Sequence, residues 1–410
     1  MWRAFGFGSS DNNNGSNHTG QSGGGQSSSS SSESQRRRRI STLNTSGESD
    51  ATEGGAPTGA TTRQREDRGS VLPYVYESCI KAGFDPDDGA DKIDKECQDN
   101  CLIFESMLDD PRHSFVCVFD GHGQNGRKVS TWMVNNMIRL MQASSNFNPR
   151  NMTQNLKLTF KDASFAAEAE MAKLNFDTQL SGTTATYVML TDSEVHCGWV
   201  GDSRAVMCRR TRSGGVKAVA LVADHKPGDF KEKMRIRKNG GEVRYLDPDE
   251  VDDPGPLRVF ARNYAAPGLA MSRSIGDRLA TSLGAWPKPS FRKVRITDDD
   301  ELVIVASDGL WEVFENDEAS KWCWDYVTRY READGSPPGH LPSSQRLTCA
   351  QAIAEEAQQR WVTRYNSEVV VDDTTVCVVY LKKWILHNGP SNSSKDRRTS
   401  IHVDHSALKR

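Results

Sequence analysis

The sequence contains no long apolar segment. No apolar run approaches the roughly 20 residues that a bilayer-spanning helix needs. The first residues also lack the apolar region of a secretory signal peptide and the glycine at position two that myristoylation requires. We therefore expect no membrane span, and we expect the protein to be cytoplasmic and/or nuclear.

An excess of charge of one sign is also missing. The chain has 52 Lys and Arg against 55 Asp and Glu, a net charge of -3, which argues against a dedicated nucleic-acid-binding protein. One basic cluster, Arg36–Arg39, precedes Ser41, and Arg397 and Arg398 precede Ser400 in the same way. A solvated charge run, a short targeting patch and a kinase recognition site remain open interpretations.

Paired cysteine patterns are absent as well. The nine cysteines are an odd number and lie mostly inside apolar runs, as Cys117, Cys197 and Cys377 do. This usage is typical of buried free thiols in a reducing compartment. Cys97 and Cys101 have no second pair and no histidine at zinc-finger spacing, so we expect no zinc site.

Both ends of the chain are poor in residues that build a core. Residues 1–72 consist largely of Gly, Ser, Asn and other polar residues, and residues 386–410 are again mostly polar. Such segments cannot bury enough apolar surface to offset the entropy lost on ordering. The sequence therefore predicts one folded domain, residues 73–385, between a disordered N-terminal arm and a polar C-terminal tail.

Short β-branched runs alternate irregularly with amphipathic segments in this domain. The length and composition of six runs predict strands: residues 115–119, 184–190, 195–200, 205–209, 301–307 and 374–381. Five segments predict helices: residues 128–141, 151–175, 229–238, 316–331 and 347–360. Because several strands between 184 and 209 follow one another without a helix, we expect an α+β fold of antiparallel sheets covered by helices.

Aspartates stand at the ends of these apolar strands. Asp120 opens the segment Asp-Gly-His-Gly after one strand, Asp202 and Asp308 follow two others, and Asp372 and Asp373 precede the last. A single aspartate at a strand end is ordinary turn chemistry, but several that converge would repel one another. An oxygen-ligated Mg²⁺ or Mn²⁺ would relieve that repulsion, and a pair of ions sharing a carboxylate can activate water for phosphoryl transfer.

Eight short blocks, in this order, resemble the metal-dependent Ser/Thr protein phosphatases of the phosphatase 2C family. The blocks are VFDGHG, SGTTA, WVGDSRAV, DHKPGD, NGGEV, GLAMSRSIGD, ASDGLWE and VDDTTV, spread over residues from about 90 to 381. The expected fold is then a four-layer α-β-β-α sandwich, with two central, mostly antiparallel sheets flanked by helices. The resemblance also implies two Mg²⁺ or Mn²⁺ ions per active site and a weaker third.

The resemblance assigns roles to residues at matching positions. Asp120 would bridge the two ions, the carbonyl of Gly121 would help to hold one, and Asp308 and Asp372 would complete the ligands of the first ion. His122 would be the general acid that protonates the leaving serine or threonine oxygen, a role suited to an imidazole.

Three other acids receive supporting roles by the same match. Asp202 would support the third ion, together with Glu312, which stands where the family usually has Asp. Asp277 would orient a metal-bound water. The segment 226–243 corresponds to a flap beside the active site, and the roles of the insertions at 245–268 and 331–345 are open.

The chain departs from the family pattern at its first block. Gln98 and Asp99 stand where the family's first block usually has Glu and Asp. Many members carry Gln and Asp there, but the neutral amide of Gln98 still predicts a weaker second metal. The family's phosphate-gripping arginine is missing: Asp94 is its formal match, and Lys92 or Lys95 could replace it, although lysine lacks the bidentate fork of arginine. The phosphate-binding residue is therefore unknown, with Lys95 as the tentative choice.

The resulting prediction is a protein serine/threonine phosphatase. Hydrolysis would proceed by direct attack of a metal-bridging hydroxide on phosphoserine or phosphothreonine, since the Cys-x5-Arg loop of tyrosine phosphatases is absent. The alternative is a pseudophosphatase, kept as a binding or regulatory module. The block order speaks against a two-metal phosphodiesterase or nuclease. Phosphorylated proteins are the expected partners; the oligomeric state is unknown, with a monomer favoured.

Overall fold

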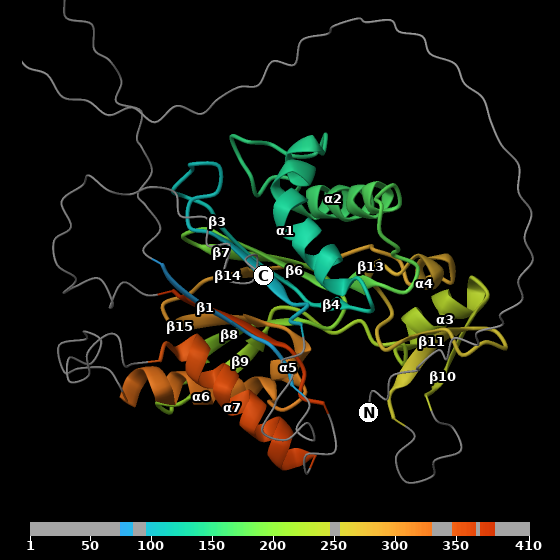
Figure 1. The fold of residues 1–410 in the computed structure, drawn as a ribbon. Helices are drawn as coiled ribbons and strands as arrows, with labels where there is room; N and C mark the ends of the chain where they lie inside the picture. Colours follow the sequence, from blue (N-terminus) through green and yellow to red (C-terminus); the bar gives the residue numbers. More distant parts are fainter. Residues whose placement is uncertain (1–73, 85–95, 247–254, 330–346, 366–369, 382–410) are drawn as a thin grey trace, which may run out of the picture. The chain divides into compact units, whose positions relative to one another are not determined.

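A computed structural model describes residues 74–84, 96–246, 255–329, 347–365 and 370–381. All of them fall within one compact unit, shown in Figure 1. The Arg36–Arg39 run, Ser41, Ser400, both chain ends and the 331–345 insertion lie outside the described residues.

Two five-stranded sheets form the centre of this unit. Strands of the first sheet lie in the order β1 (Val75–Lys81), β16 (Thr374–Tyr380), β15 (Asp300–Ala306), β8 (Arg204–Arg210) and β9 (Val216–Ala220). Strands of the second lie in the order β14 (Ser290–Arg295), β7 (Glu194–Val200), β6 (Ala185–Leu190), β3 (Ser114–Phe119) and β2 (Asn100–Phe104). Every neighbouring pair in both sheets is antiparallel.

Apolar side chains on both faces of each sheet explain why these strands are buried. Alternate residues of a strand point to opposite faces. Val116 and Val118 of β3 therefore share one apolar cluster with Val303 and Val305 of the other sheet. Phe115 and its alternate neighbours face the opposite way, into a cluster with two helices. The fully buried strands consequently read as continuous apolar runs in the sequence.

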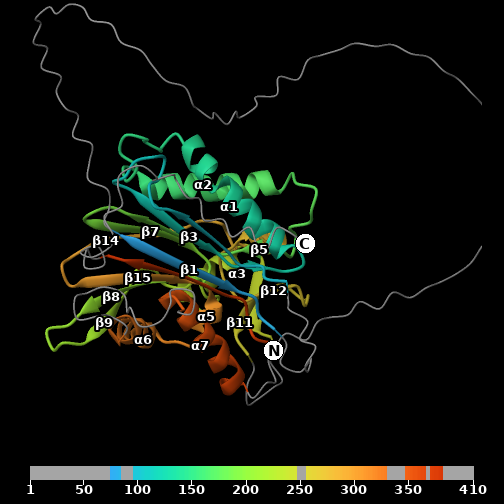
Figure 2. The same ribbon diagram turned by 60° about the vertical axis from the view of Figure 1, so that its left-hand side comes forward.

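Helices pack on the outward faces of the two sheets. The helices α1 (Gly126–Ala143) and α2 (Leu156–Met171) share their apolar cluster with β3 and β6. The helices α5 (Asp308–Trp311), α6 (Asn316–Arg329) and α7 (Cys349–Arg364) share another with β15 and β16. Figures 1 and 2 show these two helical groups on opposite sides of the strands.

A smaller group of elements adjoins the sheets. A three-stranded sheet contains β10 (Gly241–Tyr245), β11 (Leu257–Ala261) and β12 (Pro267–Leu269), and it packs with α3 (Phe230–Lys238) and α4 (Arg278–Ser282) around Ile236 and Val259. A second three-stranded sheet consists of two-residue strands, β13 (Ile275–Gly276), β5 (Gly182–Thr183) and β4 (Gly121–His122).

The expected α+β fold with antiparallel sheets and covering helices is confirmed. All six predicted strands and all five predicted helices exist, although the 151–175 helix is confined to Leu156–Met171. No disulfide joins the nine cysteines, all of which lie among the described residues, and seven of them are buried thiols, as predicted. Within the described ranges, no helix has the length and hydropathy needed to cross a membrane.

Candidate active site

Asp120 is held rigidly at the end of β3. Its carbonyl oxygen accepts hydrogen bonds from the Thr184 N–H (2.8 Å) and the Thr183 hydroxyl (3.0 Å), and its own N–H donates to the Thr184 hydroxyl (3.0 Å). Gly121 follows, and a Cβ at that position would lie 2.6 Å from backbone oxygens of Gln98 and Gly126. The SGTTA block thus fixes the backbone from which the Asp120 carboxylate projects.

Five of the predicted aspartates are close enough to interact through their charges. Burial raises the pKa of the Asp120 carboxyl far above its usual range, and the charges of Asp308, Asp99, Asp372 and Asp202 raise it further. Burial also raises the pKa of Asp308, and Asp372 and Asp202 add to that shift. The structure therefore gathers carboxylates from both large sheets into one strongly negative site.

Asp373, which was not assigned a role, positions its neighbours. Its carboxylate accepts hydrogen bonds from the backbone N–H groups of Gly83 and Gln98, both at 2.7 Å, and its own N–H donates to the Asp372 carboxylate (2.8 Å). Gly309 leaves room for this segment, because a Cβ there would lie 2.0 Å from the Asp373 carbonyl oxygen. The adjacent acids in VDDTTV thus have different tasks.

Gln98 and Asp99 occupy different environments. The Gln98 side-chain amide donates to the Gly123 carbonyl (2.8 Å), which ties this block to the Asp-Gly-His-Gly segment. Asp99 is 4% exposed, and neither of its carboxylate oxygens makes a full hydrogen bond. The nearby hydroxyls of Ser307 and Thr375 only partly offset burial and the charge of Asp373, which together raise its pKa to about 7.

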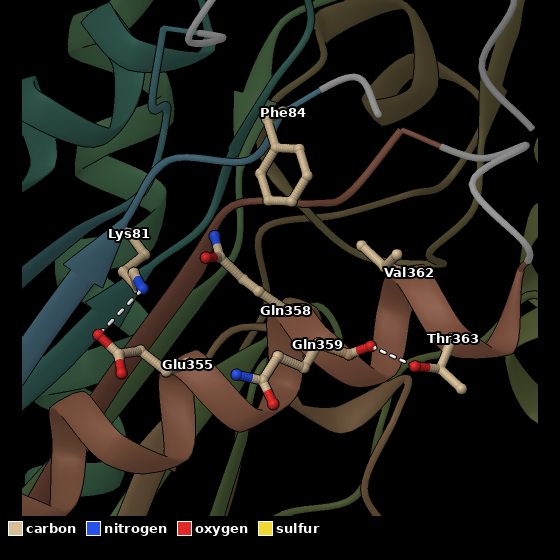
Figure 3. Close-up of a pocket in the computed structure, with 7 residues that line it drawn as sticks. All are labelled: Lys81, Phe84, Glu355, Gln358, Gln359, Val362 and Thr363. Atoms are coloured by element: carbon tan, nitrogen blue, oxygen red, sulfur yellow. Dashed lines mark hydrogen bonds and ion pairs between the residues drawn. The ribbon is translucent and has the colours of Figure 1, made fainter. Parts of the chain in front are cut away.

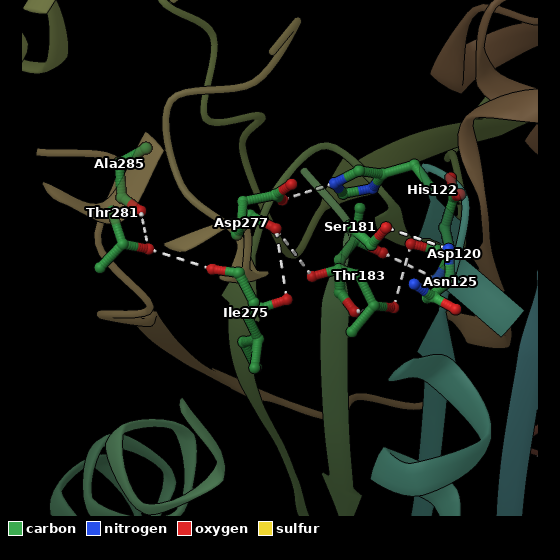
Figure 4. Close-up of polar contacts among 12 residues, drawn as sticks. Asp120, His122, Asn125, Ser181, Thr183, Ile275, Asp277, Thr281 and Ala285 are labelled. Atoms are coloured by element: carbon green, nitrogen blue, oxygen red, sulfur yellow. Dashed lines mark hydrogen bonds and ion pairs between the residues drawn. The ribbon is translucent and has the colours of Figure 1, made fainter. Parts of the chain in front are cut away.

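His122 contacts Asp277 directly. Its Nε2 lies 2.5 Å from Oδ2 of the buried Asp277, as Figure 4 shows. Burial alone would lower the pKa of His122, but the Asp277 charge and hydrogen bond raise it overall. The structure thus places Asp277, expected to orient water, on the imidazole of the predicted general acid.

Asp202, one of the five interacting aspartates, also has a lysine partner, and Glu312 has a different neighbour. Asp202 forms an ion pair with Lys226, whose Nζ lies 2.6 Å from Oδ2. The other carboxylate oxygen, Oδ1, is buried without a hydrogen bond. Glu312 is exposed and interacts with Arg204. Lys95 lies outside the described residues. Apart from the position of Lys226 in the DHKPGD block, nothing in the sequence predicts its contact with Asp202.

The donor set fits a hard cation with a partly aqueous shell. Buried carboxylate oxygens of Asp99 and Asp202 make no hydrogen bond, and neighbouring carboxylates repel Asp120. A bound cation would compensate both effects. In the described part of the chain, no group of three or more His, Cys, Asp or Glu has the spacing to hold a metal ion by itself. An ion here would take further oxygens from backbone carbonyls and water, which suits Mg²⁺ or Mn²⁺ and not zinc.

A separate pocket of about 490 Å³ contains none of these residues. Figure 3 shows it between β1 and α7. Its lining is mostly polar and includes the ion pair of Lys81 with Glu355 (3.4 Å).

Comparison with known proteins agrees with these features. A family model described as protein phosphatase 2C matches residues 87–364. The rice protein "Probable protein phosphatase 2C 64" (Oryza sativa subsp. japonica) is 32% identical over 302 residues, which are 73% of this chain and 66% of the relative. "Probable protein phosphatase 2C 61" of Arabidopsis thaliana is 31% identical over 65% of this chain and 75% of its own length.

Solved structures share the fold. The serine-threonine phosphatase 2C of Toxoplasma gondii aligns with a TM-score of 0.60 at 22% identity, over 76% of this chain and 96% of its own. A sex-determining protein of C. elegans aligns with a TM-score of 0.54 at 18% identity, over 78% of this chain and 68% of its own. Since the family model spans well over half of the sequence, the chain belongs to the protein phosphatase 2C family.

Proposed function

We propose that this chain is an active, metal-dependent protein serine/threonine phosphatase, the enzyme class of its family. The observation that carries the proposal is the convergence of the partly buried Asp120, Asp308 and Asp372 with the buried Asp99 in one mutually repelling group. A fold retained only for binding has no need to keep such an electrostatically costly arrangement. Phosphorylated proteins are the proposed substrates.

The residues divide the metal site between them. Asp120 would bridge two Mg²⁺ or Mn²⁺ ions, with the Gly121 carbonyl, Asp308 and Asp372 as further ligands. The carboxylate of Asp99, behind these ligands, would offset part of the positive charge of the ions. When bound, the ions would supply an activated water nucleophile and stabilise charge on the phosphoryl oxygens. The carboxylates would hold the ions, and through them the reacting groups, in a fixed arrangement.

His122 would supply the proton for the leaving group. Asp277 holds the imidazole at Nε2 and favours its protonated form. A protonated His122 can then donate to the serine or threonine oxygen as its bond to phosphorus breaks. This step matters for an alkoxide leaving group, which is a strong base.

Release of phosphate from a phosphothreonine peptide tests the proposal. Wild type, Asp308→Ala and the surface control Asp325→Ala on α6 would each be assayed with Mn²⁺, with Mg²⁺ and with chelator. We expect metal-dependent turnover in wild type and control and a loss of at least about 100-fold in Asp308→Ala. Folded wild-type protein without turnover would instead support the alternative, a pseudophosphatase that acts through binding.

Several broader features are proposed alongside this activity. We propose that the layers form the four-layer α-β-β-α sandwich, supported by three apolar clusters, one between the sheets and one under each helical group. We also propose a catalytic domain at 73–385, a cytoplasmic or nuclear location and a monomeric state. Any third ion would be weak, because Lys226 already neutralises Asp202.

A further inference from the structure

Glu168 of α2 reaches the turn that carries Asp277. Its Oε2 accepts a hydrogen bond from the Gly276 backbone N–H at 2.6 Å, one residue before the aspartate that contacts His122. Glu168 itself belongs to none of the eight blocks that resemble the family. It is half-buried, and its charge is close enough to interact with that of Asp277.

The turn it contacts has an unusual backbone. Gly276 has φ 92° and Asp277 has φ 44°, so two successive residues occupy the left-handed region, and one of them carries a side chain. A left-handed backbone is strained for a residue with a side chain, such as Asp277, and it persists only where surrounding contacts hold it. On the N–H side of the turn, Glu168 accepts from the Gly276 N–H and the Ser181 carbonyl accepts from the Asp277 N–H (2.9 Å). On the carbonyl side, Thr281 donates its hydroxyl to Gly276 (3.1 Å) and its N–H to Asp277 (2.8 Å). Among these four bonds, the one to Glu168 is made by a side chain of α2.

A glycine on the neighbouring strand provides space for the Asp277 carboxylate. Gly182 pairs with both Gly276 and His122 in the small sheet of β13, β5 and β4, and Figure 4 shows Asp277 reaching across to His122 beside Ser181 and Thr183. A Cβ at Gly182 would lie 2.1 Å from Oδ2 of Asp277. The carboxylate therefore reaches the imidazole through space that a side chain at position 182 would fill, and the turn sets its direction.

We propose that Glu168 is a positioning residue for the general acid: it fixes the Gly276–Asp277 turn, and so places the Asp277 carboxylate on His122. This inference rests on the proposed phosphatase function for its kinetic consequence. Glu168 touches neither substrate nor metal and acts only through the backbone. Its role requires a hydrogen-bond acceptor and not a negative charge.

The protonation of Glu168 is compatible with this role. Burial raises the pKa of Glu168 to about 7, the hydrogen bond from Gly276 opposes the rise, and the Asp277 charge adds to it. A glutamine resembles the protonated acid and keeps a carbonyl acceptor. Glu168→Gln should therefore retain the turn, whereas Glu168→Ala should release it.

Two substrates separate positioning of a general acid from general damage. A phosphothreonine peptide needs its leaving oxygen protonated, whereas p-nitrophenyl phosphate has a good leaving group that needs little help. We expect Glu168→Ala to lower kcat on the peptide by about tenfold, part of the 10²–10⁴-fold that a general acid contributes, with KM and p-nitrophenyl phosphate turnover within about twofold. Glu168→Gln should stay near wild type on both substrates.

The matched control is Glu170→Ala, two residues further along α2, which removes only an exposed ion pair with Arg139. It should leave both substrates unaffected. Equal losses on both substrates in Glu168→Ala, or no loss on the peptide, would overturn the proposal. A wild type that hydrolyses neither substrate would instead reject the phosphatase function.

A measurement without turnover tests the positioning in either case. The imidazole signals of His122 can be followed by ¹H–¹⁵N NMR in the metal-free, full-length protein, and assigned from their loss in His122→Asn. Glu168→Ala should shift them, while Glu168→Gln and Glu170→Ala should not. Unchanged His122 signals in a folded Glu168→Ala protein would refute the proposal even if the enzyme were inactive.

Discussion

At the scale of single residues, aspartates of the site perform two kinds of work. Asp120, Asp308 and Asp372 repel one another, and a bound cation would relieve this repulsion. In contrast, the carboxylate of Asp277 contacts His122, and that of Asp373 accepts hydrogen bonds from backbone N–H groups. The repulsion within the first group lowers the stability of the metal-free fold, and metal binding would restore that stability. The second kind fixes geometry whether or not metal is present.

Removing one repelling charge should stabilise the metal-free protein. Asp308→Asn keeps the shape of the side chain but deletes a charge from the group of repelling carboxylates, so its melting temperature in chelator should exceed that of wild type by a few degrees. Added Mn²⁺ should raise the melting temperature of wild type far more than that of the variant. Differential scanning calorimetry measures both, and a variant less stable than wild type in chelator would contradict the expectation.

Lys226 should compete with a weakly bound cation. Its ammonium lies 2.6 Å from Asp202 and interacts with Asp308, so Lys226→Met leaves both charges uncompensated. We expect the weakest Mn²⁺-binding step to tighten by roughly threefold to tenfold, which is about 1 kcal/mol. Electron paramagnetic resonance titration of free Mn²⁺ would show it, with Lys128→Met on α1 as the control. Weaker Mn²⁺ binding in Lys226→Met would show that Lys226 does not compete.

At the scale of secondary structure elements, α3 is fixed by a buried ionic cluster. Glu232 accepts hydrogen bonds from Arg273 (2.6 and 2.9 Å) and from the Ser272 hydroxyl (2.8 Å), and pairs with Arg235 (2.7 Å). Burial alone would raise the pKa of Glu232, but Arg273 lowers it to about 2. The helix α3 is therefore anchored by charge as well as by Ile236.

This cluster predicts a specific acid sensitivity. Because the folded-state pKa of Glu232 lies below the ordinary value of 4.5, its stabilisation is complete above pH 4.5 and is lost as the pH falls toward 2. The shift corresponds to about 3 kcal/mol. Urea unfolding in chelator at pH 7 and pH 3.5 should show a smaller loss of stability in Glu232→Gln than in wild type. Equal losses would exclude Glu232 as a source of acid sensitivity.

The start of α7 is stabilised by a capping box. The Thr348 hydroxyl accepts from the Gln351 N–H (3.2 Å), and the Gln351 side chain accepts from the Thr348 N–H (2.9 Å). Thr348→Ala should lower the free energy of unfolding by about 1 kcal/mol. Thr363→Ala, exposed near the other end of the same helix, serves as the control, and equal effects in chemical denaturation would show that the cap contributes nothing special.

At the scale of the whole molecule, sequence patterns predicted the buried parts best. Continuous apolar runs such as residues 301–307 became β15, because a strand buried on both faces leaves a plain signal. The half-exposed β1 and β14 gave no such signal, since their side chains are mixed and pairing partners hold them in place. Asp120 and Asp308 stood out because their blocks are contiguous in the chain.

Contacts between distant segments were beyond the reach of local patterns. The ion pair of Lys226 with Asp202 and the contact of Glu168 with Gly276 join residues 24 and 108 positions apart. The contact of Asp277 with His122 was not predicted for a similar reason: it depends on the space left by Gly182 in a third segment. Only tertiary structure brings such groups together.

The pairing of β1 with β16 has a consequence for biosynthesis. Val75 lies opposite Tyr380, so the first strand of the first large sheet has its partner only after almost the entire folded region has been translated, and Asp372 arrives with that same last segment. A nascent chain still short of β16 has an incomplete sheet and lacks one of the proposed metal ligands. We therefore expect prematurely terminated chains to have no phosphatase activity and to be degraded.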